Sequence, residues 1–444
     1  MTTTVKNVGL FFIVACLIAG TGFIQSWNTA LFILNMGLIS AIMALGVNLQ
    51  WGFAGLFNVG IMGFVAIGGL ASVLISMPPT NDAWAAGGVH VLLGLLLGAA
   101  TVTAAIHVQT HLKSGRTKTL STIGILTGGF FLFRYVFDGG VNAVEAIDAA
   151  STGYLGGLNF GGDNYRDWGF MAVVSWPVGG LLAAGVAWLI GKTALGLRSD
   201  YLAIATLGIS EIIIAVMKNE DWLARGVKNV IGLPRPVPYE IDLQESASFL
   251  ERAASIGVDP VTASSIVVKL GYAGLFTVVL VIVLVLAQLA LASPWGRMMR
   301  AIRDNEDAAG AMGKNVTARH LQIFILGSAI CGVAGAMMTT LDSQLTPTSY
   351  QPLRFTFLIW VMVIVGGSGN NFGSVLGGFL IFFLWVQVEP MGAILMQGIT
   401  AGMAEDNGFR IHLLDSVAHM RLLTMGLILI LVLRFAPKGL IPEK

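Results

Sequence analysis

The segment 293–319 gathers charged and small residues in a basic, helix-forming stretch. Its residues of interest are Arg297, Arg300, Arg303, Glu306, Asp307, Ala308, Ala309 and Gly313. Small side chains let one helix approach another surface closely, and flanking charges set the register of an interface. These residue types and spacings hold no catalytic constellation, but they permit close contact with another surface.

Glu211 is a single carboxylate within the apolar run 199–217. An ionisable group within a membrane span is a functional candidate by default, because its burial is costly. Glu211 could line a translocation pathway together with Thr206, Ser210 and Asn58. It could equally brace a neighbouring helix through a hydrogen bond, or lie near the outer interface.

Residue patterns typical of enzymes and metal sites are missing from the chain. It has no His-Glu-x-x-His, no Cys-x-x-Cys and no Gly-x-Ser-x-Gly. His107 and His111 lie four residues apart, but a hydrated pair at a membrane interface explains them better than a metal site. We expect no catalytic residue, no metal and no cofactor, and we do not expect an enzyme.

The composition indicates which elements must position these residues. Of the 444 residues, 55% are hydrophobic and only 11% are charged. A soluble protein of this size carries about a quarter charged residues on its surface. The composition therefore excludes a soluble enzyme and a disordered chain, and the net charge of +1 leaves no basic stripe for nucleic acid. It predicts an all-α, polytopic transmembrane bundle.

Hydropathy predicts about twelve spans, although two short ones could form a re-entrant loop. The predicted spans are 8–25, 30–48, 54–76, 89–110, 119–137, 170–191, 199–217, 266–292, 318–340, 354–366, 372–388 and 420–436. With both termini in the cytoplasm, the inner segments hold about 14 Lys and Arg residues and the short outer segments about four, which fits the positive-inside rule. The segment 293–319 is then cytoplasmic, and 218–265 is a long outer segment.

Two glycine-rich turns interrupt the apolar runs on the predicted cytoplasmic side. The first contains Gly52 and Gly55, and the second contains Gly366, Gly367 and Gly369. We interpret each as the turn of a helical hairpin or as a re-entrant break. Their similar placement hints at an internal repeat.

Five segments resemble the permeases of branched-chain amino-acid ATP-binding-cassette (ABC) importers. Asp307-Ala308-Ala309-x-x-x-Gly313 is similar to the Glu-Ala-Ala-x-x-x-Gly signature of ABC-importer permeases, with Asp in place of Glu. The others are 197–212 with its Tyr-Leu-Ala-Ile-Ala-Thr-Leu-Gly, the two glycine turns, and the tail 434–440. The resemblance covers about 30–76 and 175–440, whereas about 80–170 looks like an insertion into a single permease domain of residues 1–444.

The resemblance implies a multi-pass subunit of the bacterial inner membrane with 293–319 as its cytoplasmic coupling loop. Its partners would be a second related permease, two ATP-binding cassette subunits and a periplasmic amino-acid-binding protein within the lipid bilayer, and no nucleic acid. Transport would be by alternating access, driven by the ATPase subunits. Two alternatives stay open: a self-sufficient secondary transporter, and an importer of the same type for urea or short amides.

Overall fold

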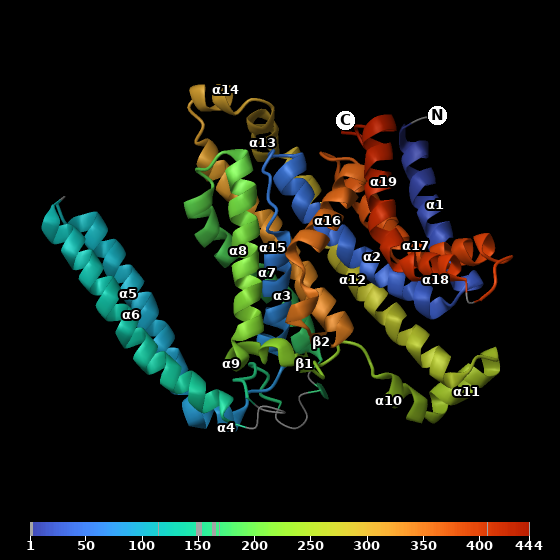
Figure 1. The fold of residues 1–444 in the computed structure, drawn as a ribbon, viewed down its shortest axis with the longest axis horizontal. Coiled ribbons are helices and arrows are strands. Elements are labelled where there is room, and N and C mark those ends of the chain that lie inside the picture. The colour runs from blue at the N-terminus through green and yellow to red at the C-terminus, as the bar shows by residue number, and fades with distance from the viewer. Residues whose placement is uncertain are drawn as a thin grey trace.

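A computed structural model describes residues 3–113, 115–147, 153–161, 166–167, 169–405 and 407–443. In this part of the chain, ten helices are long and apolar enough to cross a membrane, and the two strands are two residues each. The predicted polytopic helical bundle is therefore confirmed (Figure 1).

The long helices follow the predicted spans closely, and two shorter apolar helices complete the bundle. The span candidates are α1 (Thr3–Ile24), α2 (Trp27–Val47) continued by the π-helical turn η1 (Asn48–Gly52), α4 (Asn81–Ala83) with η2 (Trp84–Gly88) and α5 (Val89–His111), α6 (Arg116–Glu145), α7 (Phe170–Ala194), α8 (Ser199–Asn219), α12 (Pro260–Ala292), α15 (Val316–Asp342), α17 (Asn371–Ile399), and α18 (Gly408–Asp415) with η6 (Ser416–His419) and α19 (Met420–Phe435); the shorter helices are α3 (Ile61–Ser76) and α16 (Pro352–Gly366).

The helices that follow the two glycine turns differ in length from their predictions. The span predicted at 54–76 begins as a helix only at Ile61, because residues 55–60 run as a non-helical segment after the first glycine turn. The span predicted at 372–388 continues as α17 to Ile399, with Pro390 inside the helix. Non-helical backbone at membrane depth is tolerated where protein packs around it, which is the case for the first glycine turn.

The centre of the bundle consists of α2, α3, α7 and α15, with α16 and α17 beside them. Glycines bring these helices into close contact. A Cβ atom on Gly68 of α3 would overlap the carbonyl oxygen of Gly332 on α15, and one on Gly335 would overlap the carbonyl oxygen of Val65. Close packing through small residues is how helices associate in a membrane, where there is no hydrophobic force between them.

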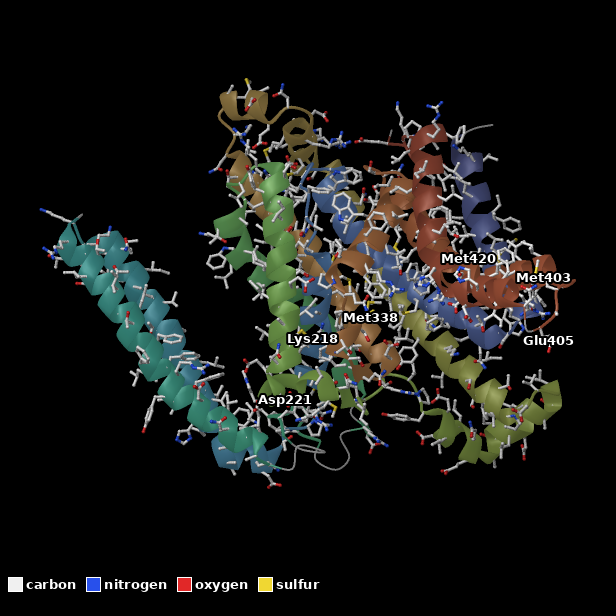
Figure 2. All side chains as sticks on the ribbon, in the orientation of Figure 1. Lys218, Asp221, Met338, Met403, Glu405 and Met420 are labelled. Carbon is white, nitrogen blue, oxygen red and sulfur yellow. The ribbon has the colours of Figure 1, made fainter. Side chains whose placement is uncertain are left out.

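Helices α5 and α6 form an arm that stands apart from the bundle in Figure 1. The two helices pack against each other, with Gly94 of α5 against Phe137 of α6. A small apolar cluster that includes Phe137, Leu155 and Trp222 joins the arm to the bundle at one end only. Elsewhere its side chains project into open space (Figure 2).

The segment 218–265 contains short elements at the end of the bundle where the arm is attached. They are α9 (Asp221–Ala224), the 3-10 turn η4 (Gly226–Lys228), strand β1 (Val230–Ile231), α10 (Glu240–Glu245) and α11 (Ala247–Ile256). Strand β1 pairs antiparallel with β2 (Gln344–Leu345), which is followed by the 3-10 turn η5 (Pro347–Ser349).

Both chain ends lie at the opposite end of the bundle, together with α13 (Pro294–Asp304) and α14 (Glu306–Ala311) (Figure 1). This is the relative placement that the charge distribution predicts for the two termini and the segment 293–319.

Candidate functional site

The charged segment folds as two short helices with different degrees of burial. Ser293 precedes Pro294, whose ring suits the first turn of α13, and Asn305 begins α14 by accepting a hydrogen bond from the backbone N–H of Ala308. Helix α13 buries Met299 and Ile302 against the bundle, whereas α14 buries no residue. The segment is therefore anchored through α13 and presents α14 outward.

The predicted docking residues differ in their exposure. Five of these residues are exposed: Arg297, Glu306, Asp307, Ala308 and Gly313. Ala309, Arg300 and Arg303 are only partly exposed. Next to Gly313, Met312 is also 80% exposed. Most exposed members of the predicted set thus lie on α14 and the turn that follows it.

Arg303 turns inward and contacts both glycine turns. Its Nη1 donates to the carbonyl oxygen of Gly52 at 2.6 Å and lies 2.9 Å from Oε2 of Glu443. A Cβ atom placed on Gly369 would lie 3.4 Å from the same Nη1. Partial burial by itself lowers the pKa of Arg303, but hydrogen bonds and charge attraction from Glu443 and Asp304 outweigh it and raise that pKa. The guanidinium is a permanently charged link between α13 and the turns.

The two glycine turns, 52–60 and 366–373, touch each other directly. Oδ1 of Asn48 accepts from the backbone N–H of Gly369 at 2.9 Å, and Nδ2 of Asn48 donates to Oδ1 of Asn371 at 3.0 Å. A Cβ atom on Gly52 would lie 2.5 Å from the nitrogen of Gly369, so only glycine fits at that position. Gly55 marks the sharp part of the first turn, with a φ of 71° that favours glycine.

The C-terminal tail closes over the second turn. The N–H groups of Leu440 and Ile441 donate to the carbonyl oxygens of Val365 and Gly366, both at 2.9 Å. Gly367 allows this approach, because a Cβ atom on it would overlap the carbonyl oxygen of Ile441. Sequence reasoning did not single out Glu443 or Asn371, since no local pattern indicates that the tail and the turns meet.

Asn58, Thr206 and Ser210 lie in the packing between α3 and α8. Nδ2 of Asn58 donates to Oε1 of Gln50 at 2.9 Å, and Oγ1 of Thr206 accepts from the backbone N–H of Val59 at 3.1 Å. Ser210 faces Gly63 at close range, and all three predicted residues are buried. Gln50, which sequence reasoning missed, extends the network to the carbonyl oxygen of Phe324 on α15.

Glu211 lies on the other side of α8 from these three residues. It is exposed, and no hydrogen bond or ion pair joins it to another residue in the described ranges. Tyr201, Ile204 and Gly208 are exposed at helical spacing along the same face. The structure thus brings Asn58, Thr206 and Ser210 together and leaves Glu211 apart from them.

Comparison with known proteins agrees with this architecture. A family model described as "Branched-chain amino acid transport system / permease component" matches residues 146–433. That range includes α7, α8, the α13–α14 segment and the second glycine turn. The first glycine turn and the α5–α6 arm precede it.

Several relatives carry related names. The chain is 28% identical over 224 residues to the high-affinity branched-chain amino acid transport system permease protein LivM of Escherichia coli, which is 49% of this chain and 51% of the relative. It is 25% identical over 248 residues to a probable LivM of Methanocaldococcus jannaschii, covering 56% and 61%. The fructose import permease protein FrcC of Rhizobium meliloti matches over 22% of the chain and 28% of its own length at 28% identity.

The chain spans about half the length of the relatives from E. coli and M. jannaschii that it matches. No solved structure matches it. The helical bundle defines a multi-pass membrane protein. Within that class, the chain belongs to the family of branched-chain amino acid transport system permease components, as the resemblance predicts.

Proposed function

We propose that this chain is the permease subunit of an ABC importer that moves branched-chain amino acids across the bacterial inner membrane. Transport proceeds by alternating access and is driven by separate ATPase subunits. The observation that carries the proposal is the link from the α13–α14 segment through Arg303 to both glycine turns. The family match and the names of the relatives support the solute class.

In this proposal the exposed surface of α13 and α14 seats in an ATPase subunit. The small side chains of Ala308 and Ala309 with Gly313 permit close docking, while Arg297, Glu306 and Asp307 set the register. Displacement of the segment pulls on Arg303, which is hydrogen-bonded to the first turn and paired with Glu443 beside the second. Both turns then move together, since Asn48 joins them.

The proposed complex contains a second related permease, two ATP-binding cassette subunits and a periplasmic amino-acid-binding protein. The face of α8 that carries Glu211 is the proposed contact with the second permease or with the solute pathway between them. A lone carboxylate facing lipid would be costly, so a protein or aqueous neighbour is the favoured environment. Asn58, Thr206 and Ser210 would hold α8 in place through contacts on its buried side.

We propose that the whole chain is one permease domain with the α5–α6 arm as an insertion within about 80–170. The arm joins the bundle through one small cluster, which supports this division. The ends of the chain and α13–α14 would lie in the cytoplasm, and 218–265 would lie in the periplasm, where it could dock the binding protein.

Two alternatives are distinguishable from this proposal. A secondary transporter would couple an ion to carboxylates in its pathway, and Glu211 is the residue that favours it. An importer for urea or short amides would share every feature above except the solute.

The test is uptake by the reconstituted complex. The proteoliposomes contain the chain, its partner permease, both ATPase subunits and the binding protein. They should take up radiolabelled leucine only when ATP is present inside the vesicles. Unlabelled valine should compete with this uptake. Uptake that follows an ion gradient without ATPase subunits would establish the secondary transporter. Competition by urea but not by valine would establish the other solute class.

A further inference from the structure

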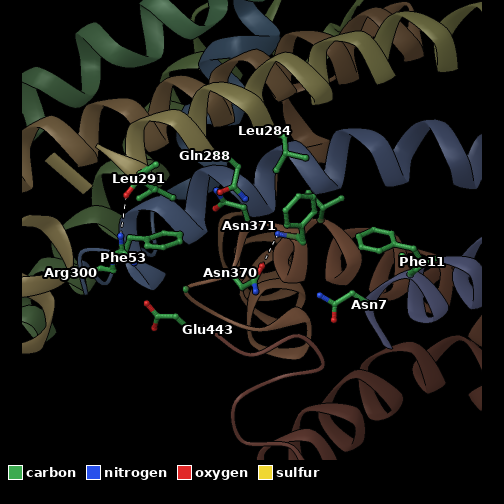
Figure 3. A pocket seen from close by; sticks show the side chains of 15 residues that line it. Asn7, Phe11, Phe53, Leu284, Gln288, Leu291, Arg300, Asn370, Asn371 and Glu443 are labelled. Carbon is green, nitrogen blue, oxygen red and sulfur yellow. Dashed lines mark hydrogen bonds between the residues drawn. The ribbon is translucent and has the colours of Figure 1, made fainter. Parts of the chain in front are cut away.

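A cavity of about 790 Å³ lies between α1, α12, α13 and the second glycine turn. It is at the end of the bundle that carries both termini. Figure 3 shows its two kinds of wall: Phe11 and Leu284 on α1 and α12, and polar side chains on the turn and the tail. Val375 of α17 extends the apolar part. The cavity is therefore amphipathic.

The polar part contains a buried donor without an acceptor. Asn371 is 2% exposed and lines the cavity. Oδ1 of Asn48 accepts from the N–H of Gly369, so Nδ2 of Asn48 must donate to Oδ1 of Asn371. This fixes the orientation of the Asn371 amide and leaves its Nδ2 without a partner among the described residues. An unsatisfied buried donor destabilises the fold unless a ligand or water accepts from it.

The polar part also contains an arginine without a carboxylate partner. Nη2 of Arg300 donates to the carbonyl oxygen of Leu291 at 3.1 Å, which holds the side chain against the cavity (Figure 3). Among the described residues, no ion pair reaches Arg300, and its other donors have no partner. The carboxylate of Glu443 also lines the cavity, but Arg303 neutralises it. Arg300 therefore makes the cavity attractive to an anion.

The position of the cavity indicates where its ligand comes from. Helices α1 and α12 form its outer walls, and their backs face the surroundings, with Phe12 of α1 and Leu289 of α12 69% and 64% exposed. These are the first turns of α1 and the last turns of α12, which lie at the membrane surface in a chain with this topology. An amphiphile in that leaflet reaches the cavity with its charged group at the level of Arg300.

We propose that this cavity binds an anionic phospholipid, with the phosphate at Arg300 and Asn371 and part of an acyl chain along Phe11, Leu284 and Val375. A charge-assisted contact from guanidinium to phosphate is among the stronger hydrogen bonds in proteins. The bound lipid ties α13 to the second glycine turn, so it stabilises one arrangement of the segment that contacts the turns. The proposal does not depend on which solute is carried.

The test uses the purified full-length chain in detergent and native mass spectrometry with added phosphatidylglycerol or phosphatidylcholine. The wild-type chain should retain phosphatidylglycerol in preference to phosphatidylcholine. Arg300→Gln should lower retention of phosphatidylglycerol about tenfold, the effect of one charge-assisted hydrogen bond. Arg300→Lys should retain part of it, because the positive charge remains.

Arg297→Gln is the matched control. Arg297 lies one turn earlier on α13, also donates to a backbone carbonyl, and does not line the cavity. Equal retention of phosphatidylglycerol by the wild type, Arg297→Gln and Arg300→Gln would overturn the proposal. Thermal unfolding without added lipid shows whether each variant is folded.

A second experiment distinguishes binding of a lipid from binding of a free phosphate ester. Leu284→Trp fills the apolar part of the cavity and should lower phosphatidylglycerol retention while Arg300 is unchanged. Glycerol 3-phosphate at the same concentration should displace little lipid, since it lacks the acyl chain. Full displacement by glycerol 3-phosphate, with unchanged retention in Leu284→Trp, would contradict a lipid site.

Discussion

The guanidinium of Arg303 donates a 2.6 Å hydrogen bond to the carbonyl oxygen of Gly52. The two residues are 251 positions apart in the chain. Gly52 in turn leaves no room for a side chain against Gly369 of the second glycine turn. A movement of α13 therefore has a direct physical route to both turns.

Arg303→Gln should uncouple ATP hydrolysis from transport. The variant loses the pairing with Glu443 and the charge-assisted bond to Gly52, which together exceed the roughly 1.5–3 kcal/mol of one hydrogen bond to a charged group. We expect leucine uptake per ATP hydrolysed to fall at least about tenfold in proteoliposomes, with ATPase activity retained.

Lys314→Gln is the control for this change, because Lys314 is exposed and, in the part of the chain that the structure describes, makes no hydrogen bond or ion pair with the turns. An uptake-to-hydrolysis ratio that is the same in Arg303→Gln, Lys314→Gln and wild type would show that Arg303 does not transmit motion.

Ala308→Trp should weaken docking of the ATPase subunit. Ala308 is exposed on α14, a helix that buries no residue, so a large side chain does not disturb the bundle. It does prevent the close approach that small residues allow. We expect co-purification of the ATPase subunit to fall severalfold, while the thermal unfolding midpoint of the chain stays within a few degrees.

Ser255→Trp on α11 serves as the comparison, since Ser255 is equally exposed at the opposite end of the bundle. Undiminished co-purification of the ATPase subunit with Ala308→Trp would place the docking surface elsewhere.

Glu211→Gln should lower uptake without lowering stability. The carboxylate has no partner among the described residues, so its neutralisation removes no contact within the chain. If the face of α8 lines the pathway or meets the second permease, uptake changes severalfold or assembly of the two permeases weakens. Uptake assays and co-purification of the two permeases measure these effects separately.

Glu251→Gln, an exposed carboxylate on α11, controls for a general effect of charge. Normal uptake and normal assembly in Glu211→Gln would mean that the carboxylate has neither role.

Asn48→Ala should destabilise the junction of the two glycine turns. The substitution leaves the N–H of Gly369 and Oδ1 of Asn371 without partners inside the bundle. Each buried unsatisfied group costs about 1–3 kcal/mol, so the unfolding midpoint should fall by several degrees. Thermal denaturation in detergent is the measurement.

Asn219→Ala, at the exposed end of α8, removes an amide whose hydrogen bond lies at the surface and should change the midpoint little. Similar midpoints for Asn48→Ala and Asn219→Ala would contradict a structural role for the Asn48 pair.

Most of the fold could be predicted because spans depend on local hydropathy. The run at 266–292 is strongly apolar and is observed as α12. The predicted start of the helix at 54–76 was wrong. Residues 55–60 are apolar enough for a span, but they are not helical because they follow a turn that Gly55 makes possible.

The candidate site was predicted only in part. The exposed residues of α14 follow from local charge and residue size. The inward direction of Arg300 and Arg303 does not, because all three arginines of α13 look alike in the sequence. Only the bundle beneath α13 distinguishes Arg297, which is exposed, from Arg303, which reaches Gly52.

By itself, the sequence determined that this protein is a helical membrane permease, where its spans lie and which segment projects from them. These properties depend on neighbouring residues, whose hydropathy and charge act locally. Tertiary structure alone decided that Asn48 meets Asn371, that α5 and α6 stand apart and that an amphipathic cavity forms below α13. Asn48 and Asn371 are 323 positions apart, and only packing of the whole bundle brings such residues within hydrogen-bonding distance.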